Sequence, residues 1–262
     1  MNKLNLLAAS ALLAVAGEAS ALTVSTPDGS VTWDPNYVNL SEIDWIGQFD
    51  FTQFYSTSSL AEGADPVLAG AVGINTVLGS LTGDSSASGY FLSGVGEIYR
   101  INEANPVSCT TPSCELTFSF GGIGLNNDQT FDITNAWAKI YINDLTPNFS
   151  NTSINQAQVD AVNEGSLFLD LEFSSLAFTS GTVENGVVSA TFNIIGGAAQ
   201  PYFDPQTLTY TADAQFNTTT NAAYSNGGNG SIYGNTQDLP EPTTIALLGL
   251  GLLGLARSKR EI

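Results

Sequence analysis

Hydrophobic and polar residues alternate along most of the chain with a period of two. Between residues 43 and 52 apolar side chains alternate with polar ones, and the same alternation runs through residues 116–120 and 208–216. Successive side chains of a β-strand point to opposite faces, so each of these segments would present one apolar and one polar face. This pattern is typical of antiparallel sheets that have one face in contact with water.

Turn signals support the same interpretation. Asn185-Gly186 separates two alternating segments, 176–184 and 187–195, and Asn-Gly favours a tight hairpin because both residues tolerate positive φ. Only residues 154–162 predict a short helix, whereas glycines weaken a helical interpretation of residues 66–81. Further strands are expected at residues 90–101, 136–143 and 167–173.

These elements predict an all-β fold, a single antiparallel β-sandwich of jelly-roll type, over residues 22–217. Residues 218–239 are rich in Asn, Thr and Gly, and they predict a flexible linker outside the sandwich. Ile232-Tyr233 is the one place in that linker where a short strand could form.

The N-terminus predicts export. Lys3 precedes an apolar stretch over residues 4–16, and Ala19-Ser20-Ala21 supplies an A-x-A cleavage site. A basic start, an apolar core of this length and small residues at the end are typical of a secretory signal peptide. We therefore expect residues 1–21 to be removed, which leaves Leu22 as the first mature residue.

The C-terminus has three parts in a fixed order. Pro240-Glu241-Pro242 comes first, an apolar segment over residues 243–256 follows, and basic residues over 257–260 come last. As a helix the apolar segment would be roughly 21 Å long, shorter than a bilayer core of about 30 Å. It could still span a membrane if the basic side chains reach the interface, with the basic end on the cytoplasmic side.

This arrangement resembles the PEP-CTERM sorting domain, and the resemblance covers about 24 of the 262 residues. It implies an exported protein of a Gram-negative bacterium that makes exopolysaccharide. It also implies a partner, the transpeptidase-like membrane enzyme exosortase, which would cut at or near Pro240, Glu241 and Pro242. The segment 243–256 would then be a transient inner-membrane anchor, and the mature protein would reach the cell surface or extracellular matrix. The body of the chain resembles no family.

Composition excludes several functions. Residues 22–239 contain 22 acidic residues and two basic ones, Arg100 and Lys139, so their formal charge is −20. Such a body cannot neutralise phosphates, and nucleic-acid binding is excluded. The chain has no histidine, which removes the commonest general base and zinc ligand. We therefore expect a non-enzymatic protein without a cofactor.

Cys109 and Cys114 are the only cysteines. In an exported chain they are expected to form a disulfide, and this short loop would contribute about 2 kcal/mol. A metal site or redox pair is the alternative, but it would lack further Cys or His ligands.

A candidate binding surface follows from the segment 136–143. Trp137, Lys139, Tyr141 and Asn143 share one face of the predicted strand, and apolar residues occupy the other. If the apolar face points to the core, the first set forms an exposed aromatic and polar stripe on which a sugar of an exopolysaccharide could stack, as in a lectin. The alternative is that Trp137 and Tyr141 pack beneath a neighbouring loop.

Two other groups of polar residues were candidates for chemistry. Asp170 and Glu172 share a polar strand face and could act as a glycosidase acid–base pair, whose carboxylates stand roughly 5–10 Å apart, although a solvated strand face has the same pattern. This pair is the basis of the alternative function, a secreted carbohydrate-active enzyme. Loop oxygens over residues 126–128 and at Asp204 could contribute to a calcium site or to ordinary turns, so the sequence does not decide the metal question.

Overall fold

The computed structural model describes residues 21–35, 37, 43–102, 114–144 and 154–237. Within this part of the chain eight long strands form the main sheet: β3 (Trp45–Ser56), β4 (Ala87–Ile101), β5 (Glu115–Asn126), β7 (Trp137–Asn143), β8 (Ser166–Gly181), β9 (Asn185–Gly196), β10 (Phe203–Gln215) and β11 (Gly228–Thr236). The smaller elements are β1 (Leu22–Thr26), β2 (Gly29–Trp33), β6 (Phe131–Asp132), α2 (Ile74–Ser80), α3 (Gln156–Val162), η1 (Leu68–Gly70) and η2 (Gln200–Tyr202).

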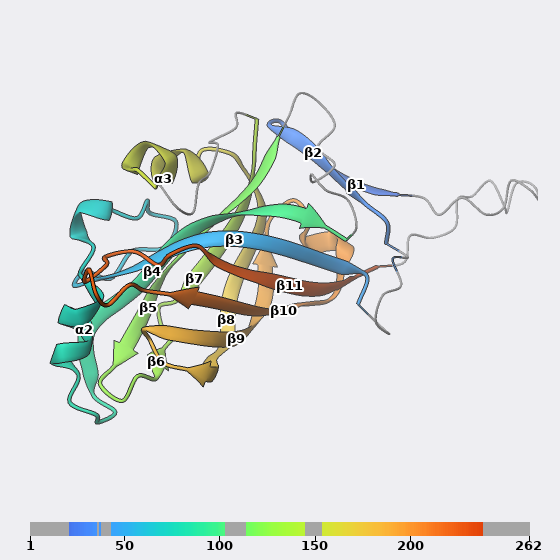
Figure 1. Cartoon of the computed structure of the whole chain (residues 1–262). Helices are drawn as coiled ribbons and strands as arrows, with labels where there is room; N and C mark the ends of the chain where they lie inside the picture. The colour runs from blue at the N-terminus through green and yellow to red at the C-terminus, as the bar shows by residue number, and fades with distance from the viewer. Residues whose placement is uncertain (1–20, 36, 38–42, 103–113, 145–153, 238–262) are drawn as a thin grey trace, which may run out of the picture.

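The eight long strands close into an antiparallel barrel (Figure 1). Each strand pairs with the next long strand along the chain, and β11 pairs with β3 to complete the ring. The all-β prediction is confirmed, but the sandwich is not: every strand of the ring has a partner on both sides. The alternating pattern could not separate the two folds, because a barrel and a sandwich both bury every second side chain.

Strand β11 corrects the prediction that residues 218–239 form a flexible linker. Its residues Gly228–Thr236 pair with β3 on one side and β10 on the other, so this strand closes the barrel. The segment looked unstructured because its inward positions are mostly glycine. Those glycines lie where large side chains from neighbouring strands fill the interior.

Four phenylalanine–glycine pairs shape the barrel wall. The pairs lie directly opposite each other on neighbouring strands: Phe49 with Gly230, Phe51 with Gly228, Phe118 with Gly96, and Phe120 with Gly94. A Cβ atom placed on Gly94 would lie 2.5 Å from Cζ of Phe120, and one on Gly230 would lie 2.5 Å from Cζ of Phe49. Each ring therefore rests on the backbone of its neighbour, a close approach that only glycine allows.

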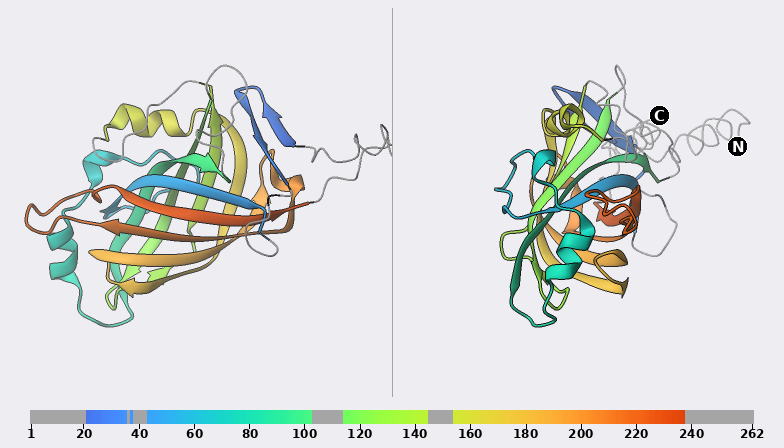
Figure 2. Two further views of the ribbon diagram at one scale, coloured as in Figure 1. Left: turned by 45° about the vertical axis from the view of Figure 1, so that its right-hand side comes forward. Right: turned by 60° about the vertical axis from the view of Figure 1, so that its left-hand side comes forward.

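The connections alternate between the two ends of the barrel because neighbouring strands are antiparallel. The β3–β4, β5–β7, β8–β9 and β10–β11 connections share one end, which we call the open end (Figures 1 and 2). The β7–β8 and β9–β10 connections share the opposite end with the β1–β2 hairpin, and we call it the closed end. Helix α2 belongs to the open end, and its Ile74 and Val77 are buried in the main core.

Four aromatic residues fill the closed end. The ring of Trp33 lies 6.3 Å from Phe168 and 6.4 Å from Phe203, and Trp45 lies 5.5 Å from Phe203. All four are buried, and the indole of Trp33 also donates a hydrogen bond of 3.4 Å to Thr236 Oγ1. The β1–β2 hairpin thus supplies a plug for this end of the barrel, which we call the aromatic plug.

Two local predictions can be compared with the structure. The short helix predicted at residues 154–162 is confirmed as α3, which begins at a capping box between Asn155 and Gln158. The hairpin around residue 185 is also confirmed, but its turn is formed by residues 182–184. Gly181, with φ of +81°, takes the left-handed conformation there, whereas Asn185 and Gly186 already belong to β9.

The phenylalanine–glycine pairs lead to a stability prediction. We expect Gly94→Ala to lower the free energy of unfolding by about 1–3 kcal/mol, because its Cβ would overlap both Phe120 and the carbonyl oxygen of Thr52. Gly79→Ala in α2 is the matched control, since nothing lies within 4 Å of its new Cβ and alanine favours the helix. Urea denaturation measures both variants. Equal stability of the Gly94→Ala variant and the wild type would contradict the packing argument.

Candidate functional site

The barrel interior contains a cavity lined by side chains from all eight strands of the ring. It lies between the aromatic plug and the open end. The wall is largely aromatic, and its rings include Phe49, Phe51, Phe118, Phe120, Phe173, Phe178, Phe192 and Tyr210. Sequence analysis placed most of these residues on inward strand faces but did not identify a cavity, because the same pattern describes a completely filled core.

The cavity is large enough for a small organic molecule. The space open to the centre of a water-sized molecule is ≈ 90 Å³. One water needs about 10–15 Å³ by this measure. Treated as a sphere and widened by a water radius of about 1.4 Å, the space becomes about 300 Å³, the lower end of the range for small-molecule sites.

Five polar side chains line the cavity, and three of them, Gln53, Tyr55 and Tyr210, lie on inward strand faces among the apolar residues. Gln53 and Tyr55 share the inward face of β3, and Tyr210 belongs to β10. Burial raises the pKa of both tyrosine hydroxyls well above the ordinary value, so both remain protonated at neutral pH. The site is therefore an apolar chamber with a few neutral hydrogen-bonding groups.

The exposure of the wall changes toward the open end. Thr182 in the β8–β9 turn and Asp213 near the end of β10 line the cavity and are exposed, whereas Ile98 and Ile140 farther inside are buried. The cavity therefore meets solvent beside the β8–β9 turn, a region that we call the mouth.

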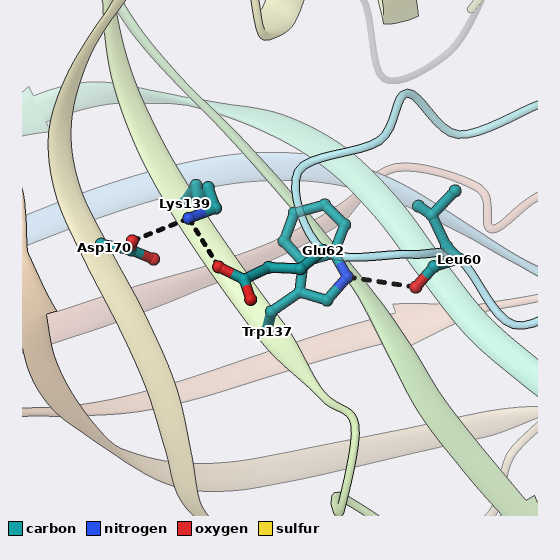
Figure 3. A network of polar contacts seen from close by, with 5 residues as sticks. All are labelled: Leu60, Glu62, Trp137, Lys139 and Asp170. Carbon is teal, nitrogen blue, oxygen red and sulfur yellow. Dashed lines mark hydrogen bonds and ion pairs between the residues drawn. The ribbon is translucent and has the colours of Figure 1, made fainter.

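The predicted stripe of Trp137, Lys139, Tyr141 and Asn143 does face away from the barrel interior, as expected. It is not an open surface, however, because Trp137 is 4% exposed and Tyr141 is 7% exposed. The indole of Trp137 donates a hydrogen bond of 3.3 Å to the carbonyl oxygen of Leu60, in the segment that follows β3 (Figure 3). This is the alternative arrangement, in which the aromatic residues lie beneath a neighbouring segment.

Lys139 fixes that covering segment by its charge. Its Nζ lies 2.9 Å from Glu62 Oε1 and 2.7 Å from Asp170 Oδ2, so it joins the covering segment to strand β8 (Figure 3). Asn143 is also buried, and it donates hydrogen bonds to Thr117 Oγ1 and, at 3.1 Å, to the carbonyl oxygen of Val162 at the end of α3. Trp137, Lys139 and Asn143 thus hold the outer layer of the barrel, and contact of the four side chains with a carbohydrate stays a prediction.

The two carboxylates of the candidate acid–base pair, Asp170 and Glu172, have different surroundings. Asp170 accepts a hydrogen bond from Lys139, while Glu172, two residues along β8, is exposed. Both lie on the outer face of the barrel, away from the cavity.

The candidate calcium residues lie in hydrogen-bonded turns. Asp128 accepts hydrogen bonds from the backbone N–H and hydroxyl of Thr130, at 3.0 and 2.6 Å, and Asn127 donates one to Ser86. Asp204 lies at the opposite, closed end of the barrel. Among the described residues no group of three or more His, Cys, Asp or Glu side chains is arranged to hold a metal ion.

Cys114 is buried at the closed end and is disulfide-bonded. Cys109 lies outside the described residues, so the expected bridge between the two stays a prediction.

Three carboxyl groups that the sequence analysis did not select lie together on the outer wall. Asp50 on β3 is directly opposite Glu97 on β4, and Glu115 lies on the adjoining β5. Burial, with the charges of Glu115 and Asp50, raises the pKa of Glu97 to about 7. Burial also raises the pKa of the other two carboxyl groups. The sequence does not reveal this cluster, because its three residues lie on separate strands and meet only in the folded sheet.

Comparison with known proteins identifies the C-terminal segment of the chain. Residues 238–260 match the family model described as the PEP-CTERM protein-sorting motif. The chain carries a PEP-CTERM sorting motif. The match contains Pro240, Glu241 and Pro242, which lie outside the described residues, and it does not extend into the barrel. No match to the chain was found among curated proteins or among solved structures.

The PEP-CTERM motif implies an exported protein that is sorted through an exosortase. No helix in the described part of the chain is long and apolar enough to cross a membrane. The predicted anchor over residues 243–256 lies outside that part.

The Glu97 cluster leads to a prediction about pH. Because the folded state binds the Glu97 proton more tightly than the unfolded state, stability should fall as pH rises from about 4.5 to about 7. Glu97→Gln removes this titrating group. We expect the variant to have a higher Tm than the wild type at pH 8, and the difference to shrink at pH 5.

Glu115→Gln is the companion variant, because it removes the charge that opposes ionisation of Glu97. It should lower the Glu97 pKa, as measured from carboxyl carbon NMR shifts across the same pH range. A difference in Tm between wild type and Glu97→Gln that does not change from pH 5 to pH 8 would refute the assignment.

Proposed function

We propose that this protein is a non-enzymatic binding protein of the bacterial surface or extracellular matrix, whose barrel holds one small apolar molecule. The observation that carries the proposal is the cavity inside the closed barrel. Its wall is largely aromatic, it contains a few neutral polar groups, and it reaches solvent at the mouth. An apolar, concave site with few convergent polar groups is the usual form of a small-molecule site.

Water is a poor occupant of this cavity. A buried water needs two to four polar partners, and a chamber lined by phenyl rings offers few of them. An apolar molecule would instead gain contacts with the rings and release the water around its own surface. A barrel of eight strands is also the size at which an interior can retain space for one small ligand.

The non-enzymatic part of the proposal follows from the placement of charges. Of the side chains that line the cavity, only Asp213 is ionisable near neutral pH, and it lies at the exposed mouth. The carboxyl groups of Asp50, Glu97, Glu115 and Asp170 belong to the outer wall. Among the described residues that line the cavity, no nucleophile is paired with a base, and this supports a binding role for the space.

The location of the protein rests on its sorting motif. We propose that the segment 243–256 is a transient inner-membrane anchor, that exosortase cuts near Pro240–Pro242, and that the released barrel stays at the surface in association with exopolysaccharide. The sorting family supports the last step. The buried state of Trp137 means that such an association would use surfaces other than its ring.

The cavity proposal predicts binding of a neutral fluorescent probe, N-phenyl-1-naphthylamine. Titration into the mature protein should give a saturable rise in fluorescence with one site per chain. Ala212→Leu should weaken binding roughly tenfold or more, because Ala212 lines the cavity and the larger side chain fills it.

Thr211→Leu is the matched control, since residue 211 is exposed on the opposite face of β10. It should leave the affinity unchanged. Absence of saturable binding in the wild type, or equal binding in the wild type and a folded Ala212→Leu variant, would rule out the cavity as the site.

The sorting proposal predicts the ends of the mature protein. Intact-mass analysis of protein from its host should find that residues 1–21 are absent and that the C-terminus lies near Pro240–Pro242. Replacement of these three residues by alanine should retain the uncut chain in the membrane fraction, and host cells without exopolysaccharide should release the wild type into the medium. A mature protein that begins at Met1 and ends at Ile262 would exclude sorting.

A further inference from the structure

The cavity contains polar groups that the protein itself leaves without partners. Tyr55 is 1% exposed, and Tyr210 is partly buried in the barrel wall. Among the described residues, no hydrogen bond joins either hydroxyl, or the side-chain amide of Gln53, to another group. Buried polar groups normally have partners, since losing water without replacement is unfavourable. Here the missing partner belongs in the cavity.

Tyr210 is held firmly in the wall. Its ring stacks on Phe192 with 5.2 Å between centroids and 17° between planes, and it lies 6.3 Å from Phe49. Phe192 in turn contacts Phe173 at 4.5 Å. The hydroxyl is therefore carried by a ring that packs against rings from β9 and β3, which suits a fixed hydrogen-bond donor.

The charges around the cavity favour neutral ligands. Asp213 lies at the mouth, and Glu184 lies in the β8–β9 turn beside it. Among the described residues no basic side chain lines the cavity. Lys139 is paired on the outer wall, and Arg100 lies opposite the outward-facing Gln48 of β3. A carboxylate ligand would be repelled on approach and would find no counter-charge inside.

Resting on the binding function proposed above, we infer that the cavity selects a neutral aromatic molecule that carries a hydrogen-bond acceptor such as a carbonyl oxygen. The rings of the wall supply edge and face contacts to an aromatic ligand, and the Tyr210 hydroxyl donates to its acceptor. Gln53 and Tyr55 lie farther toward the open end of β3, where they can contact a second polar group or a water that accompanies the ligand.

Three naphthalenes of nearly equal shape test this inference on the mature protein from its host. They are 2-ethylnaphthalene, which has no acceptor, 2-acetylnaphthalene, which has a neutral carbonyl, and 2-naphthoate, which is anionic. Fluorescence titration should show that the acetyl compound binds about 2- to 12-fold more tightly than the ethyl compound, the range for one net hydrogen bond. The naphthoate should bind more weakly than the acetyl compound.

Tyr210→Phe removes only the donor. It should bring the affinities of the acetyl and ethyl compounds together while leaving that of the ethyl compound unchanged. Tyr233→Phe is the matched control: Tyr233 lies on the adjacent strand β11 but follows the inward-facing Ile232, so it points out of the barrel. This variant should keep the wild-type preference.

The outcomes distinguish a failure of this inference from a failure of the proposed binding function. If no naphthalene binds, the proposed function itself fails. If all bind with equal affinity, or if Tyr210→Phe keeps the preference for the acetyl compound, the cavity binds ligands but the selection by Tyr210 is wrong. Binding of 2-naphthoate as tight as that of 2-acetylnaphthalene would overturn the selection for neutral ligands.

Discussion

The contact between a phenyl ring and the backbone of a facing glycine is the interaction on which this barrel depends. Phe49 and Phe51 reach across the β3–β11 seam, where the ring closes, and Phe118 and Phe120 reach across β4–β5. In a barrel of eight strands the interior is narrow, so a large side chain on one strand needs a small one opposite it. The glycines supply that room, and the rings cover backbone that would otherwise lack side-chain contacts.

This packing also determines where space remains. The large plug residues, Trp33 and Trp45 among them, fill the closed end, whereas the rings that contact glycines line the wall of the cavity. Cavities are costly when they leave apolar atoms without contacts. A barrel that keeps such a space, with unpartnered hydroxyls in its wall, has the form of a site that a ligand completes.

The sequence predicted the tail and the strands better than the closure or the site. The sorting motif is one continuous segment of the sequence, and period-two alternation identifies strands wherever one face is buried. Closure depends on Gly228–Thr236, whose glycine-rich sequence suggests a linker until the facing phenylalanines are known. The cavity depends on how far those rings extend, and the Asp50–Glu97 pairing depends on strand register. None of these is encoded by neighbouring residues in the chain.

On the outer wall, aromatic and polar side chains that look like a binding surface in the sequence have a structural role. Trp137 and Tyr141 have the composition of a binding surface, yet both are buried, and Trp137 supports the segment that contains Leu60 and Glu62. Lys139, one of two basic residues between positions 22 and 239, is used for the same purpose. Because Lys139 is paired in the outer layer, it contributes no charge to the cavity, and the only charged side chain among the described lining residues is Asp213 at the mouth. That arrangement directs recognition to hydrogen bonding and ring contacts rather than to charge.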